Sequence, residues 1–73
     1  WLFAVSKNEN LFSFHFLGSI MVTYHNPEKR DTFFIKPARI RFGNTEIKGN
    51  IIPAPYAERI RDRKIKQIDI YFK

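Results

Sequence analysis

The chain has 73 residues, no cysteine and a net charge of +6; hydrophobic residues make up 44% of it. This length allows one domain, residues 1–73, whose core must come from apolar burial without disulfides. The hydrophobic content excludes a disordered chain. The absence of about 20 consecutive, mostly apolar residues excludes a transmembrane helix.

The longest regular pattern covers residues 11–24. Its large apolar side chains stand at even positions: Phe12, Phe14, Phe16, Ile20, Val22 and Tyr24. A period of two predicts a β-strand with one apolar face. At about 3.3 Å per residue, a straight strand of this length exceeds the size of a small domain. We therefore expect one long strand that bends at Gly18, with its even side chains in the core rather than stacked on nucleic-acid bases.

Shorter strands are predicted on both sides of this segment. Residues 1–6 are expected to form an edge strand, joined to the long strand by a polar turn at residues 7–10. Residues 25–31 form a loop. A third strand is expected over residues 32–42, interrupted at Pro37, which lacks the N–H needed for strand pairing.

The dipeptide Gly43-Asn44 predicts a two-residue hairpin turn. Closing this turn pairs Phe42 with Thr45, Arg41 with Glu46, Ile40 with Ile47 and Arg39 with Lys48. The apolar pair Ile40–Ile47 then faces the core, and the opposite charges of Arg41 and Glu46 face solvent. Turn chemistry and hydrophobic pattern thus agree on one register.

The last third of the chain predicts a short helix and a final strand. Pro55 suits the first position of a helix, and Tyr56 and Ile60 would share its buried side. Residues 64–72 alternate again. Their inward positions are Ile68, Ile70 and Phe72, and their outward positions are Gln67, Asp69 and Tyr71.

This order of elements predicts a mainly β domain with one short helix before the last strand. We expect a five-stranded barrel or curled antiparallel sheet, SH3-like, with an OB-like barrel as the alternative. Residues 49–56, G-N-I-I-P-A-P-Y, resemble the G-x-I-P-x-x-Y segment that ends many SH3 domains, with one extra residue. The resemblance covers eight residues and implies a fold only; it assigns no peptide-binding residue.

The sequence offers no catalytic or cofactor motif. His15 and His25 are the only histidines and lack metal-ligand spacing. The serines have no neighbouring base, the carboxylates are scattered, and the three glycines form no phosphate-binding loop. We therefore expect a non-enzymatic protein with no metal site and no cofactor.

Charge is the one functional signal. Residues 36–73 hold ten basic and four acidic residues, which gives the whole net charge of +6. The predicted nucleic-acid-binding residues are Arg39, Arg41, Lys48, Arg59, Arg61, Arg63, Lys64 and Lys66. A basic patch of this kind predicts sequence-independent contacts with phosphates. The alternative is a protein–protein interaction module for an acidic partner. Secretion of the protein is one setting that this alternative allows.

Overall fold

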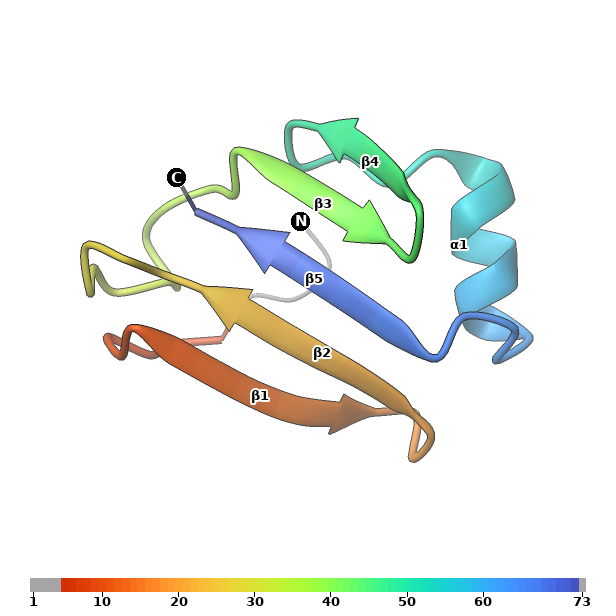
Figure 1. Cartoon of the computed structure of the whole chain (residues 1–73), viewed down its shortest axis with the longest axis horizontal. Coiled ribbons are helices and arrows are strands. Elements are labelled where there is room, and N and C mark those ends of the chain that lie inside the picture. Colours follow the sequence, from red (N-terminus) through yellow and green to blue (C-terminus); the bar gives the residue numbers. More distant parts are fainter. Residues whose placement is uncertain (1–4, 73) are drawn as a thin grey trace.

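A computed structural model describes residues 5–72 of the chain. This part contains one five-stranded sheet and one helix (Figure 1). Their bounds are β1 Leu11–Phe16, β2 Ile20–His25, β3 Arg39–Phe42, β4 Thr45–Lys48, α1 Ala54–Arg61 and β5 Gln67–Tyr71. A mainly β domain with a short helix before the last strand is thereby confirmed.

The expected long bent strand is wrong. Residues 11–25 form two antiparallel strands, β1 and β2, joined by a tight turn in which Leu17 and Gly18 have φ of 56° and 78°. Phe16 pairs with Ile20, so even positions pair with even positions. A three-residue turn therefore keeps the apolar side chains on one face, as an uninterrupted strand would. The hydrophobic pattern alone does not distinguish these two structures.

The predicted first strand, residues 1–6, falls mostly outside the described residues. Val5 and Ser6 are described and belong to no strand. The segment before β1, at residues 5–7, is instead held by the loop that follows β2. The hydroxyl of Thr32 donates to the carbonyl of Val5, and Thr32 and Lys7 exchange two further hydrogen bonds of 2.9 and 3.0 Å. The sheet has five strands because the segment expected to be one strand, residues 11–24, forms two, β1 and β2.

The Gly43-Asn44 hairpin is confirmed with its full register. Phe42 pairs with Thr45, Ile40 with Ile47, and the outermost pair is Arg39 with Lys48. The strand before the turn is shorter than expected, because residues 32–38 form turns and bends and Pro37 is buried. β3 begins two residues after this proline, as its missing N–H requires.

β5 makes the sheet mixed rather than antiparallel. It lies between β2, to which it is parallel, and β3, to which it is antiparallel (Figure 1). Its two isoleucines, Ile68 and Ile70, are completely buried, which suits a central strand. Within residues 5–72, β1 and β4 each pair with one strand only. The sheet is therefore open, and the predicted barrel, SH3-like or OB-like, is not confirmed.

The core covers one face of the sheet. Its buried side chains are Ile20, Val22, Tyr24, Ile40, Phe42, Ile60, Ile68 and Ile70. The phenylalanines of β1 pack against them, which confirms their assignment to the core. Burial raises the pKa of the Tyr24 hydroxyl above its usual range.

Helix α1 lies beside the end of the sheet where β3 turns into β4 (Figure 1). Pro55 occupies its second position, one later than expected. Ile60 is 3% exposed, and the ring of Tyr56 stacks on Phe42 with centroids 4.9 Å apart. The predicted buried side of the helix is therefore confirmed.

Candidate functional site

The other face of the sheet carries polar and aromatic side chains at positions that alternate with the core. Strand register aligns five of them in one row across all five strands, which we call the His25 row: Leu11, His25, Tyr71, Arg39 and Lys48. The next row contains Ser13, Thr23, Asp69, Arg41 and Glu46. We call this side of the sheet the open face.

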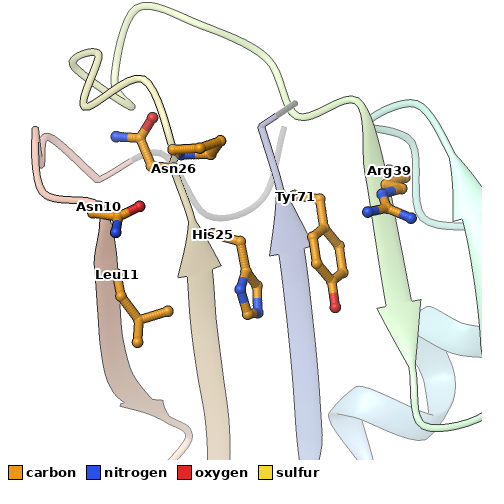
Figure 2. A pocket seen from close by; sticks show the side chains of 7 residues that line it. Asn10, Leu11, His25, Asn26, Arg39 and Tyr71 are labelled. Carbon is orange, nitrogen blue, oxygen red and sulfur yellow. The ribbon is translucent and has the colours of Figure 1, made fainter.

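A stack of three side chains forms the middle of the His25 row. The rings of His25 and Tyr71 are 4.4 Å apart and nearly parallel, at 10°. The guanidinium of Arg39 lies 4.2 Å from the centroid of Tyr71 on the other side, so Tyr71 stands between the two (Figure 2). Cation–π attraction and ring stacking both favour this order.

Hydrogen bonds fix both ends of the stack. His25 Nε2 lies 3.0 Å from the Asp69 carboxylate, which can only accept, so Nε2 donates to this carboxylate. Gln67 in turn donates to Asp69 and to the Thr23 hydroxyl. At the other end, Arg39 Nη1 donates to Glu46 over 3.1 Å. The row is therefore a preorganised group of aromatic and cationic side chains.

A pocket of about 370 Å³ opens above this row. Its lining residues are Asn10, Leu11, His25, Asn26, Pro27, Arg39 and Tyr71 (Figure 2). Asn26 is buried and holds the wall of the pocket in place, because its side chain makes two hydrogen bonds with the backbone of Arg30. The volume lies within the range of about 300–1,000 Å³ that is usual for small-molecule sites.

The opposite end of the sheet is basic. Lys64 and Lys66 line a second hollow, of about 340 Å³, together with Phe42 and Gly43 of the hairpin. Arg41 reaches the same turn, where its Nε donates to the Gly43 carbonyl over 2.9 Å. Arg63 extends to the β1–β2 turn and donates to the Leu17 carbonyl over 3.3 Å. We call Arg41, Arg63, Lys64 and Lys66 the basic end.

These four cations are exposed, and none forms an ion pair with a described residue. The other predicted site residues lie elsewhere. Arg59 lies over the ring of Tyr56, Arg61 pairs with Asp62, and Arg39 and Lys48 belong to the His25 row. The eight predicted residues thus divide into the basic end, the helix and the far row.

The expected facing of Arg41 and Glu46 is confirmed by register, yet Glu46 does not pair with Arg41. Its carboxylate accepts from Arg39, its diagonal neighbour, while Arg41 turns toward the hairpin carbonyl. Arg41 is thereby left without a carboxylate partner among the described residues.

Sequence reasoning missed the group formed by His25, Asp69 and Tyr71. His25 and Asp69 are 44 positions apart and meet because β2 and β5 pair in parallel. The alternation of residues 64–72 places Asp69 and Tyr71 on the outer face. It does not predict which strand pairs with theirs.

Comparison with protein families, curated proteins and solved structures found no significant match to this chain. Among residues 5–72, no three His, Asp or Glu side chains lie close enough to hold a metal ion. In the same part of the chain, no helix has the length and apolar character that crossing a membrane requires.

Proposed function

We propose that the protein is a non-enzymatic module that binds nucleic acid independently of base sequence, through contacts between phosphates and the basic end. The observation that carries this proposal is the grouping of four exposed cations at one end of the sheet, without carboxylate partners among residues 5–72. Arg41, Lys64 and Lys66 lie around the hairpin turn, and Arg63 reaches the β1–β2 turn. Unpaired cations grouped in this way attract the regularly spaced charges of a phosphate backbone.

Stabilisation of the helix does not account for these residues. Basic side chains near a helix C-terminus interact favourably with its dipole, but the effect fades within the last turn. Arg59 and Arg61 lie in the last turn of α1, whereas Lys64 and Lys66 lie beyond its end at Arg61. The cations that line the hollow therefore call for an explanation outside the helix.

Phosphate binding also fits the hydrogen-bonding groups present. Arg41 uses Nε for the Gly43 carbonyl and keeps its terminal nitrogens for a ligand. Lys64 and Lys66 each carry three donors on a mobile stem. Contacts of this kind read charge and position rather than base identity, so we expect similar affinities for different sequences.

Two charge-matched variants test the location of binding. The first carries Arg63→Asn, Lys64→Ser and Lys66→Ser; the second carries Lys29→Asn, Arg30→Ser and Lys36→Ser in the loop after β2. Each removes three of the positive charges, so the net charge falls from +6 to +3 in both. Arg63 and Lys29 both have positive φ, 57° and 53°, which asparagine tolerates.

The readout is fluorescence anisotropy with a labelled DNA at two or more salt concentrations. We expect the first variant to bind more weakly, with a salt dependence flatter by up to about 0.7 per lost contact with a single strand. The second variant is expected to stay close to the wild type. Equal weakening in both would show that net charge alone matters. No binding by the wild type at low salt would refute the proposal and favour an acidic protein partner.

A further inference from the structure

We propose that the pocket above the His25 row binds one base of a single-stranded nucleic acid whose phosphates contact the basic end. This inference rests on the proposed function and adds the class of nucleic acid and a second site. The pocket lies at the opposite end of the sheet from the basic end.

The walls of the pocket suit a flat, partly polar ring. Leu11 and Pro27 provide apolar surface, and the rings of His25 and Tyr71 provide aromatic surface (Figure 2). Both faces of Tyr71 are covered, one by His25 and one by Arg39. A base therefore enters on the side of His25 that faces Leu11, where it continues the existing stack by one ring.

Polar groups around the pocket are available to the edge of a base. The side-chain amide of Asn10 makes no hydrogen bond with another described residue. An amide offers both a donor and an acceptor, and every base carries a donor or an acceptor on its edge that can meet it.

The spacing of the two sites fits a short single strand. Arg39 lies in the pocket and Gly43 in the basic hollow, and both belong to one hairpin. At about 3.3 Å per residue, the four steps between them cover roughly 13 Å. A strand of a few nucleotides spans this distance. A duplex keeps its bases stacked inside the helix, so only an unpaired strand presents a base to the pocket.

Three labelled ligands of equal length test the inference: a 12-mer of deoxythymidine, an abasic 12-mer of the same charge, and a 12-base-pair duplex, which has no unpaired base and carries twice the charge. We expect the thymidine strand to bind more tightly than the abasic strand by roughly 5- to 150-fold, the contribution of one stacked base. His25→Ala is expected to remove this preference. The matched control is His15→Ala, because His15 lies on the same face at the other end of β1. This variant is expected to keep the preference for thymidine over abasic DNA.

Leu11→Ser provides a second variant, which leaves the contact between His25 and Asp69 in place. Because Leu11 is 60% exposed, we expect the fold to tolerate this change. It too is expected to reduce the preference for thymidine over abasic DNA. If the thymidine and abasic strands bind equally, the pocket inference is overturned while phosphate binding at the basic end stands. If none of the three ligands binds at low salt, the proposed function itself fails, and the pocket inference with it.

Discussion

The two faces of the sheet are built from alternate residues of the same strands and differ in almost every physical property. On the core face, Tyr24, Ile40 and Ile70 are completely buried among apolar side chains. On the open face, their neighbours His25, Arg39 and Tyr71 form a stack that stays partly exposed. One face supplies stability through apolar burial, and the other arranges charge and rings without being needed to hold the strands together.

Substitutions at two adjacent residues of β3 should show the largest difference between the two faces. Ile40→Ala is expected to lower the free energy of unfolding by about 2–5 kcal/mol, since Ile40 is fully buried. Arg41→Ala removes one exposed hydrogen bond to Gly43 and is expected to cost less than about 1.5 kcal/mol. Urea denaturation of both variants measures this difference. Equal losses would mean that the open face also carries the fold.

The turn between β1 and β2 gives the next largest effect. Gly18 has φ of 78°, and a Cβ placed there meets no atom within 4 Å. A side chain at this position therefore meets no clash, and we expect Gly18→Val to be destabilising through its backbone conformation alone, by about 1–2 kcal/mol. Gly18→Asn, which tolerates positive φ, is expected to cost clearly less. Thermal or urea unfolding of the two variants tests this, and equal costs would contradict the left-handed turn.

Tyr24 connects the core face to pH. Burial raises its pKa in the folded state above the unfolded value of about 10, so the unfolded state loses the proton first. Stability is therefore full below pH 10 and falls above it, by up to about 1.4 kcal/mol per pH unit from this residue. Tyr24→Phe is expected to flatten the decline between pH 10 and 11. Urea titrations of the wild type and of Tyr24→Phe at pH 10 and pH 11 measure this decline in the free energy of unfolding. An equal decline in both proteins would contradict the burial of this hydroxyl.

The smallest effect concerns the ion pair of the open face. A double-mutant cycle on Arg39 and Glu46 is expected to give a coupling of about 0.2–1 kcal/mol, because both side chains are well exposed. The cycle on Arg41 and Glu46 is expected to give a smaller value, although these two residues are directly opposite. A larger coupling for Arg41 with Glu46 than for Arg39 with Glu46 would show that the ion pair forms between the directly opposite residues, as the hairpin register alone predicts.

Features set by neighbouring residues were predictable from the sequence. The Gly43-Asn44 register follows from two turn residues and four alternating positions, and the buried side of α1 follows from Tyr56 and Ile60. The split at Gly18 was not predictable, because an odd-numbered turn and an unbroken strand give the same alternation. The hydrophobic pattern shows which side chains share a face, but it does not show whether the chain continues straight or reverses direction.

Features that depend on distant pairing were out of reach. The parallel contact between β2 and β5 joins His25 to Asp69 and Tyr71, and it decides both the mixed sheet and the pocket. The charge of residues 36–73 is a sum over the sequence, and it did not show that the basic residues divide between the basic end, the helix and the His25 row. Their division depends on how the hairpin turn meets the α1–β5 loop.

The most direct test of the open face as the binding surface is a ¹H–¹⁵N chemical-shift titration of the protein with a short deoxythymidine strand. The account predicts that the perturbed backbone amides gather in two groups: residues 41–43 and 63–67 at the basic end, and Leu11, His25 and Tyr71 at the pocket. Helix residues 54–58 and the loop at residues 28–36 are expected to stay unperturbed. Saturable binding with shifts confined to that loop or helix would contradict the account.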